Sequence, residues 1–187
     1  MKLTRSVAIG VLSLVAIASA TAAPNADNAE RKASVLPATV TELDLSLFDG
    51  KWFELARIPI PIGRDWVNTR DIYIKNSDGT WSVRYEGNKG SSDGPGKVLK
   101  QRLRIPDSAR PGDMEVSFIP FIWMKYRLLY MSDDYRFMVV GSSSMNLLWL
   151  MSREANPSSG EYEALKVKAA SLGYDTAKLE RVSQSGN

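Results

Sequence analysis

The side chains that usually carry out catalysis are scarce in this sequence. Its 187 residues include neither His nor Cys, which removes the commonest proton acceptors, thiol nucleophiles and transition-metal ligands. Carboxylates remain, and Glu54 is expected to be buried and hydrogen-bonded rather than to act as a base. Arg70 and Asp71 fall on neighbouring faces of one predicted strand and are expected to be solvated. We therefore predict no catalytic residue, no metal site and no cofactor.

A Trp and a distant Arg suggest a structural pairing instead. Trp52 stands two residues after Gly50 at the start of a predicted strand, and Arg153 ends another strand about a hundred residues later. An indole can close one end of a β-barrel, and a guanidinium stacked on its face would hold it through a cation–π contact. The alternative is that Trp52 is ordinary core and Arg153 is a surface cation. The spacing alone leaves both interpretations open.

The rest of the sequence has the pattern of a β protein. Short runs rich in Val, Ile, Tyr, Trp and Phe are separated by clusters of Gly, Pro, Asn, Asp and Ser. Strands are predicted at about 51–58, 69–76, 80–87, 97–105, 113–119, 125–131, 135–141 and 146–152. Ser158 and Glu161 match a capping box, which predicts a helix that stops near Gly173, and a short strand follows at 179–182. This order predicts an all-β fold: an eight-stranded antiparallel up-and-down β-barrel with one C-terminal α-helix packed outside.

Alternation along these strands separates an inner from an outer face of the barrel. For example, Trp81, Val83 and Tyr85 alternate with polar neighbours. The residues expected inside, where they would contact a ligand, are Tyr73, Trp81, Val83, Tyr85, Leu103, Val116, Phe118, Tyr126, Leu128 and Tyr130. The competing interpretation of each is side-chain core below the cavity, and about half of them are expected to touch ligand. Tyrosine hydroxyls near the top could anchor a polar head group.

Strand direction assigns the connections to the two ends of the barrel. Neighbouring strands of a meander run in opposite directions, so Trp52 lies at the same end as the 132–135 turn. The residues expected to form the barrel floor are Gly50, Trp52, Glu54, Asp134, Tyr135 and Arg153. The opposite end is expected to carry an apolar rim formed by Ile60, Ile62, Phe121, Ile122 and Trp123. Such a rim either touches a membrane or folds inward as a lid.

The N-terminal residues are typical of an exported protein. Residues 1–22 have the basic start, apolar stretch and small-residue cleavage site of a signal peptide. Residues 23–44 are predicted to be a flexible segment, and residues 45–187 are predicted to be the domain. Removing Lys2 and Arg5 leaves 22 basic against 21 acidic residues, a balance that does not favour nucleic-acid binding. Without Cys no disulfide can form, so a core must hold the fold.

Several motifs resemble those of the lipocalin family. Gly50-x-Trp52, Asp134-Tyr135 and Arg153 are similar to its three short sequence regions. The stretches GKWFELARIP, VSFIPF, DDYRFMVVG, LLWLMSR and ASLGYDTAKLERVSQ are similar to the bacterial, apolipoprotein D-like branch. The resemblance runs from about Leu47 to Gln184. This sequence departs from many bacterial members in lacking a Cys for lipid attachment, and the Pro-rich first loop differs from theirs.

The resemblance implies a protein that carries or stores a small hydrophobic ligand, such as a fatty acid or lysophospholipid, in the cell envelope. The expected location is periplasmic or secreted, with no lipid anchor, and the expected partners are a lipid and a membrane surface rather than nucleic acid. A homodimer formed through the apolar surface of the last strands is an open expectation. The alternatives are a lipocalin-fold, isomerase-like enzyme acting on a lipid, and a β-barrel interaction module. We expect a binding protein and not an enzyme.

Overall fold

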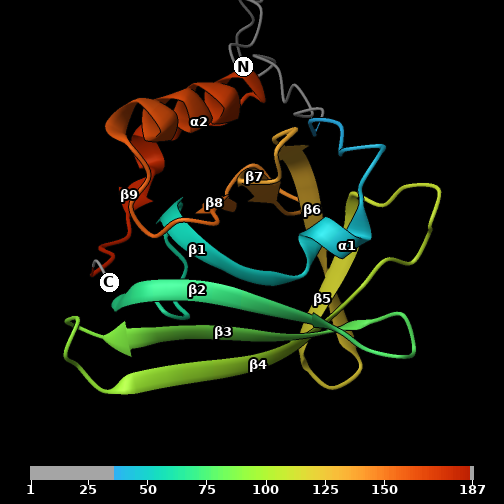
Figure 1. Ribbon diagram of the computed structural model, residues 1–187, viewed down its shortest axis with the longest axis horizontal. Coiled ribbons are helices and arrows are strands. Elements are labelled where there is room, and N and C mark those ends of the chain that lie inside the picture. The colour runs from blue at the N-terminus through green and yellow to red at the C-terminus, as the bar shows by residue number, and fades with distance from the viewer. Residues whose placement is uncertain (1–35, 186–187) are drawn as a thin grey trace, which may run out of the picture. The chain divides into compact units, whose positions relative to one another are not determined.

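The computed structural model describes residues 36–185 (Figure 1). The predicted signal peptide and residues 23–35 of the predicted flexible segment lie outside the described residues. Residues 36–44 of that segment contact the strands: the Val40 amide donates to the Leu128 carbonyl at 3.0 Å, and Arg127 donates to the Pro37 carbonyl at 2.7 Å. The described residues contain two α-helices, α1 (Leu45–Phe48) and α2 (Ser159–Ser171), and neither has the length and the apolar run needed to cross a bilayer.

Eight antiparallel strands close into a barrel, as the sequence predicts. They are β1 (Gly50–Arg57), β2 (Trp66–Lys75), β3 (Trp81–Lys89), β4 (Gly96–Arg104), β5 (Asp113–Ile119), β6 (Ile122–Met131), β7 (Phe137–Gly141) and β8 (Leu148–Ser152). Each strand pairs with the next along the chain, and β1 pairs with both β8 and β2, which closes the sheet. The register puts Trp52 opposite Asp71 and puts Asp71 opposite Tyr85. These three side chains therefore share the inner face.

The outer helix covers strands that are apolar on both faces. The helix α2 (Ser159–Ser171) begins with the predicted capping box, in which Ser158 and Glu161 exchange hydrogen bonds. The helix lies outside the barrel (Figure 1), and one buried cluster joins its apolar residues to β7 and β8. The members from these three elements are Val139, Leu148, Leu150, Tyr162, Leu165 and Ala169.

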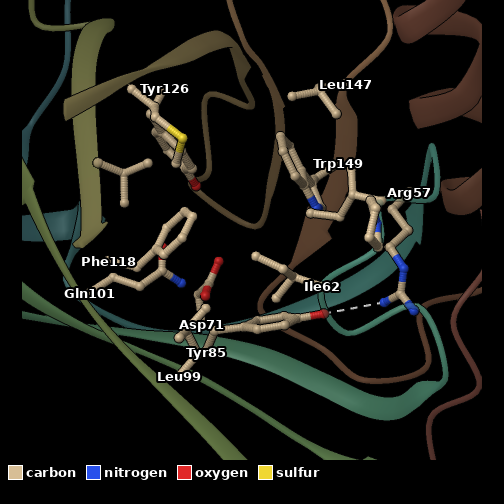
Figure 2. Close-up of a pocket in the computed structure, with 14 residues that line it drawn as sticks. Arg57, Ile62, Asp71, Tyr85, Leu99, Gln101, Phe118, Tyr126, Leu147 and Trp149 are labelled. Atoms are coloured by element: carbon tan, nitrogen blue, oxygen red, sulfur yellow. Dashed lines mark hydrogen bonds between the residues drawn. The ribbon is translucent and has the colours of Figure 1, made fainter. Parts of the chain in front are cut away.

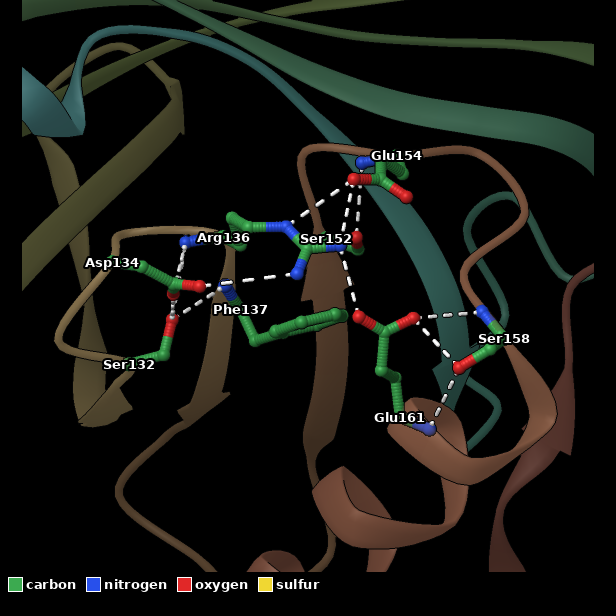
Figure 3. Close-up of polar contacts among 8 residues, drawn as sticks. All are labelled: Ser132, Asp134, Arg136, Phe137, Ser152, Glu154, Ser158 and Glu161. Atoms are coloured by element: carbon green, nitrogen blue, oxygen red, sulfur yellow. Dashed lines mark hydrogen bonds and ion pairs between the residues drawn. The ribbon is translucent and has the colours of Figure 1, made fainter.

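An ion-pair network joins the first turn of α2 to the barrel (Figure 3). Arg136, just before β7, contacts Glu154 at 2.7 Å and Glu161 at 2.9 Å. The same Glu161 carboxylate accepts hydrogen bonds from the backbone and hydroxyl of Ser158. The network thus fixes the start of the helix next to the end of β8.

The C-terminal residues fill a gap between β1 and β2. The strands β1 and β2 pair only over Gly50–Phe53 and Arg70–Tyr73, and β9 (Glu180–Arg181) pairs with the far half of β1. Beyond β9, the Gln184 side chain donates to the carbonyls of Glu54 at 2.8 Å and Thr69 at 3.0 Å. One amide side chain therefore bridges the two strands where their own pairing ends.

Candidate functional site

Inside the barrel, next to the β1–β2 loop, lies an apolar cavity of about 400 Å³ that is partly open to solvent (Figure 2). Strands β1 to β6, β8 and the β1–β2 loop contribute to its wall. Its apolar lining consists of Ile60, Pro61, Ile62, Leu99, Val116, Phe118, Met124, Leu147 and Trp149. Its polar lining consists of Arg57, Asp71, Tyr85, Gln101 and Tyr126. This size and this lining, with a few convergent polar groups, are typical of sites for small organic ligands.

Trp52 and Arg153 meet at the closed end of the barrel. Trp52 is fully buried, its indole nitrogen donates to the Phe48 carbonyl at 2.9 Å, and the Arg153 guanidinium carbon lies 3.8 Å from its ring centre. Arg153 also donates to the carbonyls of Lys51 at 2.9 Å, Phe48 at 3.3 Å and Leu47. These contacts tie the start of β1 and the residues just before it to the end of β8, and they close this end of the barrel.

The other residues expected in the floor have distinct places. Gly50 has a φ of +97°, which favours glycine, and it lies next to the guanidinium, since a Cβ there would be 3.4 Å from an Arg153 nitrogen. Asp134 accepts from the Ser132 hydroxyl at 2.6 Å and stabilises the β6–β7 turn. The Tyr135 hydroxyl accepts from the Asp44 amide at 2.6 Å. Glu54 is buried but lies next to the cavity rather than at the floor.

The predicted interior residues divide into three groups. Tyr85, Val116, Phe118 and Tyr126 line the cavity. A second group packs with Phe48 and Trp52 into the core below the cavity, namely Tyr73, Trp81, Val83, Leu103 and Leu128. Tyr130 lies outside the barrel, where it packs on the cluster that includes α2 and the Lys168 amine lies 4.8 Å from its ring centre. A register shift between Leu128 and Tyr130 in β6 reverses the expected side.

A buried charge cluster flanks the cavity on the side of β1. One Glu54 oxygen accepts from the Thr69 hydroxyl at 2.6 Å, the Tyr85 hydroxyl at 3.0 Å and Arg57 at 3.2 Å. Arg57 also donates to the carbonyls of Gly63 at 2.8 Å, Arg64 at 3.0 Å and Trp66 at 3.2 Å. Glu54 and Arg57 thus neutralise each other, and Arg57 holds the β1–β2 loop. Burial raises the pKa of Tyr85, and the charge of Glu54 adds to that rise.

A second polar group lies at the base of the cavity. The Tyr73 hydroxyl donates to Asp71 Oδ2 at 3.1 Å and lies 2.5 Å from the Tyr126 hydroxyl. Asp71 Oδ1 is buried and has no hydrogen-bond partner within the described residues. Burial, together with the nearby charge of Glu54 and against the opposing hydrogen bond from Tyr73, raises the pKa of Asp71 to about 7. Asp71 therefore changes its charge near neutral pH.

The predicted interior and rim residues leave out eight of the fourteen lining residues, namely Arg57, Pro61, Asp71, Leu99, Gln101, Met124, Leu147 and Trp149. The period of the strands could have identified Asp71 and Gln101 among them. The expectation that Asp71 is solvated is not met: it precedes Tyr73 by two residues, and the period of a strand places both on the inner face. Gln101 lies between Leu99 and Leu103 on the inner face of β4 for the same reason. Trp149 gave no signal because its neighbours on β8 are also apolar. Nothing in the sequence marked Arg57 as the anchor of a loop. Arg70 remains partly exposed and pairs with Glu86 at 2.9 Å.

The open end separates into an inner and an outer part. Ile60 and Ile62 of the β1–β2 loop line the cavity. Phe121, at the tip of the β5–β6 hairpin, is 97% exposed with a φ of +69°, and Ile122 next to it is 54% exposed. The Arg104 guanidinium carbon lies 4.0 Å from the Trp123 ring centre on the outside of the barrel. The predicted rim thus forms both part of a lid and an exposed apolar tip.

No cluster suited to a metal ion occurs in the part of the chain that the structure describes: no three acidic side chains there converge on one point. The site is therefore an apolar cavity with one neutralised charge pair and one carboxyl group at its base. The closed eight-stranded barrel, the outer helix and this cavity place the protein in the class of calyx-shaped β-barrels.

The chain belongs to the lipocalin family, because the family model described as a lipocalin-like domain matches residues 43–184. It is 31% identical to temperature-induced lipocalin-1 of Arabidopsis thaliana over 158 residues, which cover 78% of this chain and 82% of that protein. It is 26% identical to the outer membrane lipoprotein Blc of Vibrio cholerae, over 78% of this chain and 85% of that protein. A crystal structure of the allergen Per a 4 from cockroaches aligns with a TM-score of 0.62 and 19% identity, over 81% of this chain and 94% of that one. This last likeness concerns the fold alone.

Proposed function

We propose that this lipocalin binds a small hydrophobic ligand, of the size of a single-chain lipid, in the cavity of its barrel. The observation that carries the proposal is the largely apolar cavity inside a barrel whose other end is closed by Trp52 and Arg153. Burying a hydrocarbon chain there would remove apolar surface from water at roughly 25 cal/mol per Å². The polar groups at the cavity base and side would orient the ligand.

Blocking the cavity tests this proposal. Val116 faces the cavity, so Val116→Trp should fill it with an indole and lower the affinity for the neutral dye N-phenyl-1-naphthylamine at least about tenfold, or about 1.4 kcal/mol. Dye fluorescence measures the binding. The matched control is Val98→Trp on the neighbouring strand β4, where the side chain is 56% exposed, and this variant should bind the dye like the wild type.

Equal dye affinity in both variants, with unchanged far-UV circular dichroism, would contradict the cavity proposal. Native mass spectrometry of protein taken from its host extends the test by weighing any retained lipid. Recovery of the same lipid after incubation supports a binding protein. Conversion of that lipid would favour the enzyme alternative instead.

We also propose that the protein acts in the cell envelope or outside the cell and exchanges its ligand at a membrane surface. The exposed tip of the β5–β6 hairpin supports this proposal. Phe121 and Ile122 project from the tip, and a groove beside it is lined by Lys100, Arg102 and Trp123. Apolar side chains next to cations suit a bilayer that contains anionic lipids. The similarity to Blc, whose name places that protein in the outer membrane, agrees with such a location.

Liposome pelleting tests the membrane contact. Removing two large apolar side chains from the tip forfeits a few kcal/mol of burial. The double variant Phe121→Ser, Ile122→Ser should therefore bind vesicles containing phosphatidylglycerol at least about tenfold more weakly. The control is Val167→Ser on α2, an apolar residue that is 67% exposed away from the hairpin. Unchanged pelleting of the double variant would reject the membrane contact.

A further inference from the structure

The base of the cavity presents hydrogen-bond acceptors. Asp71 borders the cavity from β2 (Figure 2), two residues before Tyr73 of the filled core. When Asp71 is ionised it accepts the one hydroxyl proton of Tyr73, so the short contact between Tyr73 and Tyr126 then takes its proton from Tyr126. The hydroxyl protons of Tyr73 and Tyr126 are then both used in hydrogen bonds among Asp71, Tyr73 and Tyr126. With Asp71 ionised, these three residues offer a ligand only acceptor capacity, most of it on the Asp71 carboxylate, whereas protonated Asp71 adds one donor.

The Arg57 guanidinium, the cation in the cavity wall, already has hydrogen-bond partners within the protein. Both terminal nitrogens of Arg57 are engaged by Glu54, Tyr85 and the carbonyls of the β1–β2 loop, and its side chain is only 6% exposed. Among the described lining residues, Arg57 and Asp71 are the ionisable groups that carry charge near neutral pH. A carboxylate pushed to the base of the cavity would therefore meet an acceptor and a like charge, with no free cation beside it.

We propose that the cavity selects ligands whose buried end is a hydrogen-bond donor, such as a long-chain alcohol or amine, and that Asp71 accepts this hydrogen bond. This proposal rests on the proposed ligand-binding function and adds the class of ligand. A ligand hydroxyl at the base satisfies an acceptor in an apolar space, where an unpaired polar group is costly. A buried fatty-acid carboxylate is disfavoured by the charge of Asp71.

The protonation of Asp71 makes this selectivity depend on pH. Its pKa of about 7 follows chiefly from burial and then from the charge of Glu54. The groups that face it are Glu54 from β1, Tyr73 on its own strand, Tyr85 from β3 and Tyr126 from β6. Burial raises the pKa of each of the three tyrosines, so their hydroxyls stay neutral near pH 7. Asp71 is thus the group whose charge changes in this range.

Two ligands with the same chain and different head groups test the proposal. Dodecanol and dodecanoate each compete with N-phenyl-1-naphthylamine for the wild-type protein at about pH 6 and about pH 8. Dodecanoate should bind about tenfold more weakly at the higher pH, because it requires the protonated fraction of Asp71, which falls about tenfold across pKa 7. Dodecanol should show no such fall and should bind more tightly than dodecanoate at the higher pH.

The variant Asp71→Asn should lose the pH dependence of dodecanoate binding, and the affinities of the two ligands should converge. The matched control is Asp133→Asn, which removes the same charge from the exposed β6–β7 turn and should bind like the wild type. Equal affinity of the two ligands at both pH values, or tighter binding of dodecanoate at the higher pH, would overturn the proposal. Dye binding without displacement by either ligand would overturn it and leave the proposed function standing. Failure of the dye to bind at all would overturn both.

Discussion

Two arginine side chains fix the two ends of the barrel in the same way. Arg153 donates to carbonyls of residues 47, 48 and 51 at the floor. Arg57 donates to carbonyls of Gly63, Arg64 and Trp66 at the mouth. A guanidinium has five donors in a fixed planar arrangement, so one side chain can satisfy several main-chain acceptors of an irregular segment. Each arginine thus ties an irregular segment, residues 47–48 or 63–64, to the adjoining strand end.

Gly63 explains part of the geometry at the mouth. It has a φ of +72°, and a Cβ there would lie 3.0 Å from the Tyr85 ring. The loop therefore approaches the cavity wall as closely as a glycine permits, and the indole of Trp66 stacks on the same ring with centroids 5.3 Å apart. The Pro-rich first loop, which the sequence marked as unusual, closes part of the cavity in this way.

Arg153→Lys tests the floor at the scale of one residue. A lysine keeps the charge but cannot donate to three carbonyls while it lies over the Trp52 ring. We expect the free energy of unfolding to fall by about 1–2 kcal/mol, the sum of a weakened cation–π contact and lost hydrogen bonds. Urea unfolding followed by tryptophan fluorescence measures this change.

Arg110→Lys is the matched control, since the Arg110 side chain is 67% exposed and pairs with Asp107 on the surface. That substitution should leave the unfolding midpoint within error. If Arg153→Lys is as stable as the wild type, the guanidinium does not hold the floor and the closed end depends on Trp52 packing alone.

At the scale of elements, local patterns in the sequence predicted all eight strands of the barrel and the helix α2. In β3 the buried residues Trp81, Val83 and Tyr85 alternate with residues that face outward, so both the strand and its inner face could be assigned. The capping box at Ser158 fixed the start of α2. Alternation failed where both faces are apolar, as in β6 and β8. There the outward position of Tyr130 and the inward position of Trp149 depend on a bulge and on packing with α2 that no local pattern reveals.

The place of the last strand could not be read from the sequence either. A short strand near residue 180 was predicted, but its partner was not. Asn68 adopts a φ of +53° at a register shift between Val67 and Arg70, and β2 leaves β1 there. The Ser185 amide and hydroxyl both donate to the Asn68 side chain. A contact across more than a hundred residues thus completes the wall next to Glu54, and only the folded chain shows it.

At the scale of the whole molecule, the barrel contains carboxyl groups that respond to pH in opposite ways. A hydrogen bond from Thr80 lowers the pKa of Asp78, and one from Ser132 lowers that of Asp134. Hydrogen bonds from Lys125 and Arg104 lower that of Glu115. Such groups stabilise the fold at neutral pH, and this stability is lost as the pH falls through their folded pKa values. Asp71 has a raised pKa, so its effect has the opposite sign.

The stability of Asp71→Asn relative to the wild type should therefore change with pH. Between the ordinary pKa of 3.8 and the folded value of about 7, the folded protein keeps a proton on Asp71 that the unfolded chain has released. The wild type should lose stability relative to Asp71→Asn as the pH rises through this window, by at most about 1.4 kcal/mol per pH unit, and the difference should level off above pH 7. Urea unfolding of both proteins between about pH 5 and about pH 8 measures it, with Asp133→Asn as the control of equal charge.

Stability curves of the wild type and Asp71→Asn that stay parallel over this range would mean that Asp71 ionises normally inside the barrel. The base of the cavity would then have to be open enough to hydrate a carboxylate, and the charge discrimination proposed for ligands would lose its physical basis along with the stability effect.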